Sequence, residues 1–437
     1  MNYSSRNLLP YPILIFLGFV LPIFLSLEDP EYSTIRSIFY IICFLASFFI
    51  FVEDIIFKQE RLSLAWYLVL VLTLWISGHL IIAKIVYGLD GSGSDLIGIS
   101  YCMFALALGT KLNHISQHKY FLSLLYAIWF LQSYLVISNV DPLYLQASYG
   151  KEDPLFSGAY QYIGDVFALI SILVIFQTHK VLNDSLQAKM LRKQEYLAQK
   201  QLQKYSSLKK KQYRQVHSNT CILLAVVIFS NVILFLNGSR ASFFSFLLTT
   251  FFIGYILFFH VRPQTSWLLF FVPVLALLIV GFTSIYNPQF VMEGNWDTLL
   301  SNRNLELVSN NDSASLEGRS YFYILGLQDL IKNPIFGNYI GRVADRGTGT
   351  YIHNILSLAQ DFGFPALAIF SWLIAYCSIF FSHQWIAEYD YEKHVFDSLL
   401  VFSAIQLIFF RNFTGFYTIY IIFGIIAYRS DKNKILS

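Results

Sequence analysis

About twelve apolar runs, each near 20 residues long, dominate this chain of 437 residues. A helix needs roughly 20 apolar residues to cross the ~30 Å hydrocarbon core of a bilayer, where backbone polar groups must be satisfied internally. With 56% hydrophobic and 13% charged residues, the chain also lies outside the usual range of soluble globular proteins. The runs start near Leu9, Ser37, Leu64, Leu96, Phe121, Ile163, Cys221, Phe243, Trp267, Ile355, Val395 and Gly415. We therefore predict an all-α polytopic integral membrane protein with about 12 transmembrane helices.

The basic residues are unevenly distributed between the loops. If the N-terminus is cytoplasmic and every run spans once, 20 of the 30 Lys and Arg residues fall on the cytoplasmic side, ten of them between the sixth and seventh runs. Cytoplasmic loops of membrane proteins carry an excess of Lys and Arg, so both termini are predicted to be cytoplasmic. The first run is too long for the core of a signal peptide and lacks a small-x-small cleavage site, so we interpret it as a span.

Two long connections divide the spans into groups. The predicted organisation is transmembrane helices 1–6 in residues 1–178, a cytoplasmic basic amphipathic helical linker in 179–219, helices 7–9 in 220–285, a large structured outer loop in 286–353, and helices 10–12 in 354–437. The linker fits either a helix resting on anionic lipid or a docking site for a partner protein. In the outer loop, apolar residues at helical spacing from Arg319 predict an amphipathic helix at the membrane surface that stops at Pro334. A Gly-rich turn follows it.

Polar side chains interrupt the start of the tenth span. At about 100° per residue, His353, Ser357, Gln360 and Asp361 fall within an arc of roughly 100° on one face of a helix. Polar groups in a span are costly unless they face the bundle interior or a water-filled cavity. This face is therefore predicted to line an outward-opening cavity with His353 at its mouth. The alternative is that His353 is an interfacial residue that caps the helix together with Asn354.

Arginine supplies a second signal at the outer ends of the spans. Arg240 lies in a short turn between spans 7 and 8, where its guanidinium is expected at the outer mouth of the bundle. The other candidates at this rim are Arg319, Arg342, Arg346 and Arg411. Arginine presents a planar fork of donors that suits a phosphate group. The alternative for each is snorkelling to the interface, most plainly for Arg411.

Several motifs of known chemistry are missing from the sequence. It contains no HExxH, no Walker-type loop, no GxSxG and no acidic DxD-like pair in an outer loop, so no metal or nucleotide cofactor is expected. The four cysteines lie in different apolar runs and are interpreted as small core residues. A donor that carries its own phosphate leaving group needs no nucleotide from the protein. His353 could then act as general base toward an acceptor hydroxyl, because an imidazole titrates near neutral pH.

Three stretches of the sequence together resemble a known family. They are SR at 239–240, directly before a span; GRSYFYILGLQDLIKNPIFGNYIG from residue 318; and HNILSLAQDFGF from residue 353. This order of Arg, aromatic residues, short helix, Asn-Pro, Gly-rich turn and His-Asn resembles the O-antigen polymerase and ligase superfamily, which includes Wzy-type polymerases and lipopolysaccharide ligases. The match covers Arg319 to Gly363 and adds Arg240, and elsewhere the similarity is one of topology. The chain departs from the family at Asp165, where such proteins often have Asn, and this puts a role for Asp165 in doubt.

The resemblance implies a metal-independent, GT-C-type membrane glycosyltransferase of the bacterial inner membrane. Its donor would be an undecaprenyl-diphosphate-linked oligosaccharide used at the periplasmic face, with 286–353 as the periplasmic catalytic loop. Arg240 and Arg319 would bind the diphosphate and stabilise the leaving group, and His353 would take the proton from the acceptor hydroxyl in an inverting displacement. Weaker candidates for substrate contacts are Arg342, Arg346, Arg411, Asn354 and Gln360. The implied partners are lipid-linked donor and acceptor, membrane lipids and a chain-length regulator protein, without nucleic acid.

Alternatives remain at two levels. Within the family, a polymerase extends a glycan onto another lipid-linked repeat unit, a ligase transfers it to lipid A-core, and a protein O-oligosaccharyltransferase uses a protein acceptor. The many Phe, Tyr, Ile and Asn residues suggest AT-rich coding sequence and favour a polymerase. Outside the family, twelve spans with a basic central linker are also typical of transporters, including flippases of lipid-linked sugars. The two halves of this chain show no correspondence, which favours the enzyme.

Overall fold

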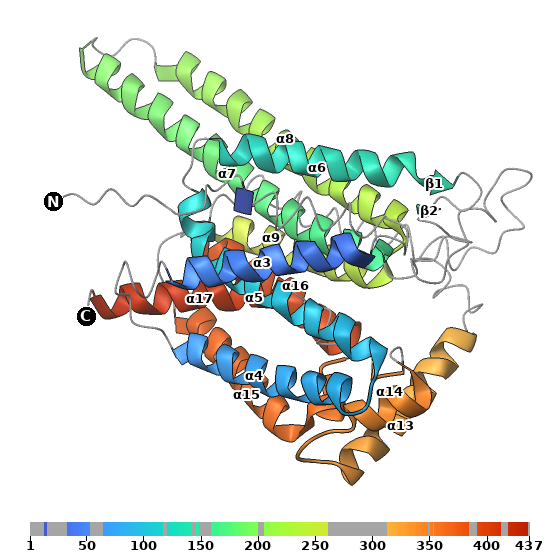
Figure 1. The fold of residues 1–437 in the computed structure, drawn as a ribbon. Coiled ribbons are helices and arrows are strands. Elements are labelled where there is room, and N and C mark those ends of the chain that lie inside the picture. The colour runs from blue at the N-terminus through green and yellow to red at the C-terminus, as the bar shows by residue number, and fades with distance from the viewer. Residues whose placement is uncertain are drawn as a thin grey trace, which may run out of the picture.

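The computed structural model describes residues 13–14, 33–52, 64–116, 120–141, 146–147, 159–199, 205–260, 313–347, 350–352, 354–383, 391–411 and 418–435. Within these ranges the protein is helical, with twelve helices and one short antiparallel ribbon (Figure 1). The elements are α3 (Ser33–Val52), α4 (Leu64–Ile85), α5 (Asp90–Ser116), α6 (Phe121–Ser138), β1 (Val140–Asp141), β2 (Gln146–Ala147), α7 (Ala159–Gln199), α8 (Tyr205–Asn237), α9 (Arg240–His260), α13 (Ser313–Lys332), α14 (Tyr339–Arg346), α15 (Leu356–His383), α16 (Tyr391–Phe409) and α17 (Thr418–Ile435).

The helices agree with the apolar pattern of the sequence. Ten of the twelve predicted runs coincide with described helices, and the runs that start near Leu9 and Trp267 lie largely outside the described residues. Four helical segments of the described part are long and apolar enough to cross a membrane: Leu64–Ile85, Phe121–Ser138, Ile163–Leu182 and Leu356–Ser378. The fold is therefore that of a helical protein compatible with membrane insertion.

The basic linker does not form a separate helix in its described residues. Instead, α7 continues to Gln199 and α8 begins at Tyr205, so the linker is built from extensions of two long helices. The resulting hairpin projects from the bundle, and its tip lies at the end opposite α13 and α14 (Figure 1). The described part of the linker is therefore helical.

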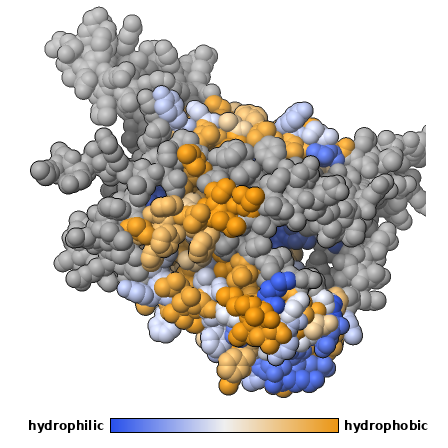
Figure 2. All heavy atoms as spheres, in the orientation of Figure 1, coloured by the Kyte–Doolittle hydropathy of each residue, from blue (hydrophilic) through white to orange (hydrophobic). Residues whose placement is uncertain are grey.

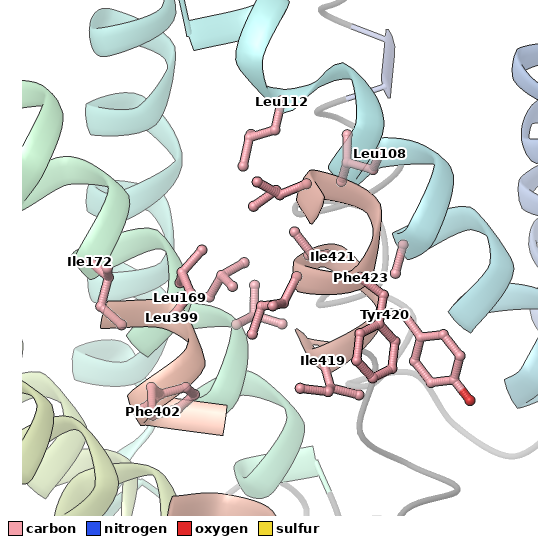
Figure 3. Close-up of a cluster of buried hydrophobic side chains, with 14 of the residues drawn as sticks. Leu108, Leu112, Leu169, Ile172, Leu399, Phe402, Ile419, Tyr420, Ile421 and Phe423 are labelled. Atoms are coloured by element: carbon pink, nitrogen blue, oxygen red, sulfur yellow. The ribbon is translucent and has the colours of Figure 1, made fainter. Parts of the chain in front are cut away.

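The centre of the bundle is formed by close packing of α5 and α17. A Cβ added to Gly109 would lie 2.1 Å from the carbonyl oxygen of Ile421, and one added to Gly424 would lie 2.1 Å from that of Leu106. The two backbones therefore touch, which is the usual role of small residues between membrane helices. Large apolar side chains fill the space around this contact (Figure 3). Those labelled are Leu108, Leu112, Leu169, Ile172, Leu399, Phe402, Ile419, Tyr420, Ile421 and Phe423.

The outside of α4 shows how apolar the exposed surface is. Tyr67, Val71 and Leu74 are exposed on one stripe of this helix, whereas Val69 and Leu72 are buried on the other. Such an exposed stripe is unfavourable in water and suits contact with lipid. In the view of Figure 2, apolar residues cover the middle of the bundle, and hydrophilic residues gather at the end formed by α13 and α14.

The outer loop contributes two helices to that end of the molecule. The predicted helix from Arg319 is present as α13, which begins earlier, at Ser313, and ends at Lys332, just before Pro334 as expected. The region predicted as a Gly-rich turn contains a second helix, α14. Residues 286–312 of this loop lie outside the described residues.

Candidate functional site

The start of α15 is fixed by Asn354. Its side-chain Oδ1 accepts a hydrogen bond from the backbone N–H of Leu356 at 2.9 Å, and the N–H of Ile355 donates to the carbonyl of Leu407 in α16 at 2.8 Å. Asn354 thus caps the helix, as one of the two interpretations of this entrance expects. Its role in binding substrate stays a prediction.

The polar face of α15 contacts the two helices of the outer loop. Gln360 and Asp361 are buried: the Gln360 amide donates to Asp329 at 3.0 Å, and its oxygen accepts from the N–H of Ile352 at 2.9 Å. Asp361 receives two hydrogen bonds from Arg342, at 2.6 and 3.1 Å. These side chains therefore hold α13 and α14 against α15, and at Gln360 and Asp361 the helix face is covered rather than open. The prediction that this face lines a cavity is not met at these two positions.

Asp329 of α13 is the hub of this packing. It accepts hydrogen bonds from Arg346, from Gln360 and, at 2.8 Å, from the side chain of Asn338. Burial acts to raise the pKa of this carboxyl, but the bonds from Arg346, Gln360 and Asn338 outweigh it, and the net pKa is lowered. Asp329 is therefore ionised at neutral pH. It joins α13 to both ends of α14 and to α15.

Arg342 lies in a mixed ionic and aromatic environment. Its guanidinium carbon is 5.5 Å from the ring centre of Tyr339 and 5.9 Å from that of Tyr351, within the range of cation–π attraction. The Tyr339 hydroxyl donates to Asp95 of α5 at 2.6 Å, and burial of that carboxyl raises its pKa. The position of α14 is thus tied to both α15 and α5.

A second cluster surrounds Arg411, just after α16. Its guanidinium lies 3.1 Å from Oδ2 of Asp165 in α7, and it donates to the side chain of Gln161 and, at 3.1 Å, to Asp165 Oδ1. Gln406 and Ser242 donate to the same oxygen of Asp165 at 3.0 and 2.6 Å. Arg411 and Asp165 are both buried, so this is a desolvated ion pair with extra hydrogen bonds, the arrangement that such a pair requires. The prediction that Arg411 snorkels to the interface does not describe this geometry.

The two clusters meet around Tyr351. Burial raises the pKa of its hydroxyl, and the charges of Arg411 and Arg342 act in the opposite direction, so both guanidiniums are within electrostatic range of the same side chain. Arg240, which is also buried, begins α9 directly after Ser239, and the Ser239 hydroxyl is 3.3 Å from the Arg411 guanidinium. Arginines distant in the sequence are therefore brought to one end of the bundle.

Three of the predicted site residues are paired with carboxylates, and two have side chains that the structure does not describe. Arg342, Arg346 and Arg411 each have a carboxylate partner within the described residues, and these pairs neutralise part of the positive charge expected at the rim. Arg319 lies in α13, although the placement of its side chain is outside the described structure, and His353 lies outside the described residues. The chain neighbours of His353, Ile352 and Asn354, are described and belong to the first cluster.

Sequence reasoning missed Asp165, Asp329, Tyr339 and Tyr351. For Asp165 a signal existed: a carboxylate within an apolar run needs a partner in the bundle, and this outweighs the departure from the family pattern. For Asp329 the signal was a carboxylate on the same helix face as Phe322 and Leu325, where it needs a polar partner. The chain has 29 tyrosines, and no sequence signal distinguished Tyr339 and Tyr351 from the others.

Gly363 forms a kink in α15 where the helix touches the turn after α13. Its φ is +82°, and an added Cβ would lie 1.9 Å from the carbonyl oxygen of Ile335 in the turn after α13. We expect Gly363→Ala to lower the free energy of unfolding by about 2–3 kcal/mol, because both the backbone conformation and the close contact oppose a side chain. Denaturant titration of the purified protein in detergent measures this.

Gly78→Ala is the matched control, because Gly78 lies in α4 and an added Cβ there meets nothing within 4 Å. We expect the control to have the stability of the wild type or slightly more. Equal stability of both variants would contradict the view that α15 must approach the turn this closely.

No family model matches the chain, and no curated protein matches it.

Proposed function

We propose that the chain is a polysaccharide polymerase of the O-antigen type, a membrane glycosyltransferase that extends a lipid-linked glycan at the outer face of the bacterial inner membrane. The observation that carries the proposal is the convergence of the segments on which the family resemblance rests. Ile355, two residues after His353, donates to the carbonyl of Leu407 in α16. The preceding Gln406 side chain donates to Asp165, which also accepts from Ser242, two residues after Arg240. A shared location is what a common reaction centre requires.

In the proposed reaction, the acceptor hydroxyl of a lipid-linked repeat unit attacks the anomeric carbon of the donor glycan. His353 takes the hydroxyl proton as the new C–O bond forms. The bond from the anomeric carbon to the diphosphate breaks, and undecaprenyl diphosphate leaves with the electron pair. Arg240 and Arg319 stabilise the charge that develops on this leaving group.

The remaining polar residues have supporting roles in this proposal. Because Arg342, Arg346 and Arg411 are paired with Asp361, Asp329 and Asp165, their first role is to hold the helices around the reaction centre. Contacts of these arginines, or of Asn354 and Gln360, with diphosphate or sugar are secondary. This division agrees with the stronger assignment of Arg240 and Arg319 in the motif.

The lipopolysaccharide ladder of a deletion strain tests the function. A polymerase defect leaves lipid A-core with a single repeat unit, and reintroducing the intact chain restores the ladder. Bare core together with long glycans on the lipid carrier would identify a ligase instead. Accumulation of lipid-linked repeat units on the cytoplasmic face would identify a flippase, the alternative of another class.

A further inference from the structure

The turn between α13 and α14 lies beside the middle of α4. The ring of Phe336 stacks on that of Trp75 with centroids 5.9 Å apart and 9° between the planes, and its centroid is 6.2 Å from that of His79. Trp75 is ten residues before Ile85, the end of α4 on the side of α13 and α14. At 1.5 Å per residue, the turn therefore reaches about 15 Å below the outer end of this helix.

Several backbone polar groups of the turn are hydrogen-bonded within the protein. The N–H groups of Asn333, Gly337 and Asn338 donate to backbone carbonyls at 2.9, 2.9 and 2.7 Å, and Pro334 has no N–H. The Pro334 carbonyl accepts from the N–H of Phe364 at 2.8 Å. Non-helical backbone at membrane depth is tolerated where its polar groups are satisfied by protein in this way.

A backbone carbonyl freed by the kink in α15 is hydrogen-bonded by a side chain of α4. The Phe362 carbonyl, freed by the kink at Gly363, accepts a hydrogen bond from the indole N–H of Trp75 at 2.8 Å. The turn, the kink and α4 thus form one junction whose backbone groups are hydrogen-bonded to each other or to Trp75. The close approach of α15 to the turn depends on Gly363, which has no side chain.

The side chains on the outside of this junction are apolar and exposed. Ile331 is 80%, Ile335 58% and Phe336 63% exposed, and on α4 Leu74, the chain neighbour of Trp75, is 63% exposed. Phe364 and Trp372 of α15 are exposed as well, at 50% and 62%. The turn therefore lies beside two helices that also carry exposed apolar side chains and are long enough to cross the membrane.

We infer that α13 and α14 form a re-entrant hairpin whose tip, Ile335–Phe336, is inserted among the acyl chains of the outer leaflet. The partner of this surface is bilayer hydrocarbon. The inference rests on the membrane location in the proposed function, but not on the glycosyl transfer itself. It changes the expected geometry, because α13 leads into the membrane rather than along its surface. It also places Asp329 and Asp361 of the site in a protein-lined position below the outer ends of the spans.

Spin labels at single cysteines test the depth of the tip. The full-length chain with Cys221→Ser, which removes the exposed native cysteine among the described residues, is the parent, and the label is introduced by Phe336→Cys or Ile335→Cys. The labelled protein is reconstituted in phosphatidylcholine vesicles. Collisions with oxygen, which partitions into hydrocarbon, are compared with collisions with a water-soluble nickel chelate. Ile335→Cys leaves the Phe336–Trp75 stack in place and keeps the test valid if Phe336→Cys disturbs folding.

Two exposed positions of α4 calibrate the measurement. Leu74→Cys marks the middle of the helix, and Val86→Cys, just beyond its outer end, marks the water interface; the side chains are 63% and 67% exposed. We expect both tip labels to behave like Leu74→Cys, accessible to oxygen and shielded from nickel. Tip labels that react with nickel like Val86→Cys would overturn the re-entrant hairpin. Nickel access at Leu74→Cys would overturn the membrane position of α4, and the re-entrant hairpin with it. Measurements of glycan extension test the glycosyl transfer alone.

Discussion

Asp165→Ala is expected to destabilise the protein by about 3–5 kcal/mol, because it leaves the guanidinium of Arg411 buried without its counter-ion. Arg411 is 8% exposed, and Asp165 also accepts hydrogen bonds from Gln406 and Ser242. Loss of the carboxylate therefore removes the hydrogen-bond partner of Ser242 in α9, of Gln406 in α16 and of Arg411 just after α16. Denaturant titration in detergent measures the loss, and the outer end of the bundle is expected to become accessible to protease first.

Two further variants separate charge from hydrogen bonding. Asp165→Asn keeps an acceptor oxygen and is expected to lose less stability than Asp165→Ala. Asp345→Ala, which removes an exposed carboxylate from α14, is the matched control and is expected to change stability by less than about 0.5 kcal/mol. If Asp165→Ala unfolds at the same denaturant concentration as the control, the ion pair does not hold this end of the bundle together.

His353→Ala is expected to abolish glycan extension while the protein stays folded and membrane-inserted. Removal of a general base costs typically 100-fold to 10,000-fold in rate, on the order of 3–5 kcal/mol of transition-state stabilisation. The rate of chain extension in membranes that contain equal amounts of each variant measures this effect. Because the base acts in the chemical step, kcat falls while binding of the lipid-linked donor remains.

The control for this variant is His118→Ala, since the sequence assigns His118 to a cytoplasmic loop. It is expected to extend glycans at the wild-type rate. Near-normal activity of His353→Ala would remove His353 as the base, and Tyr351, whose ring centre is 5.9 Å from the Arg342 guanidinium carbon, would become the next residue to replace.

Much of the fold could be predicted from the sequence, because hydrocarbon imposes one simple rule. A run of about 20 apolar residues must be helical in a membrane, and the described helices other than α13 and α14 follow this pattern. The extension of α7 and α8 into the linker was harder to predict, since polar helices leave no apolar periodicity that marks where a span ends. The short helix α14 was hidden for a different reason: Gly341 interrupts it, and glycine normally indicates a turn.

The site was less predictable, because its contacts join residues that are far apart in the chain. Arg411 and Asp165 both stand out as charges near apolar runs, yet the sequence alone offers Asp165 several arginines at the same end of the bundle. Which arginine becomes its partner depends on the tertiary packing of α16 against α7. The pairs Arg342–Asp361 and Arg346–Asp329 depend likewise on how the outer loop folds back onto α15. Polar positions on a helix face predicted a protein-facing surface, but could not tell a cavity from a surface covered by another helix.

The most direct test of the proposed function is a reaction with purified protein in vesicles. The full-length chain is reconstituted with undecaprenyl-diphosphate-linked repeat units, with EDTA present to remove divalent metal, and the products are separated by length. We expect glycans of two and more repeat units on the lipid carrier, with release of one undecaprenyl diphosphate for each bond formed and no extension by His353→Ala. Repeat units that cross the bilayer without any new glycosidic bond would contradict it and indicate a transporter.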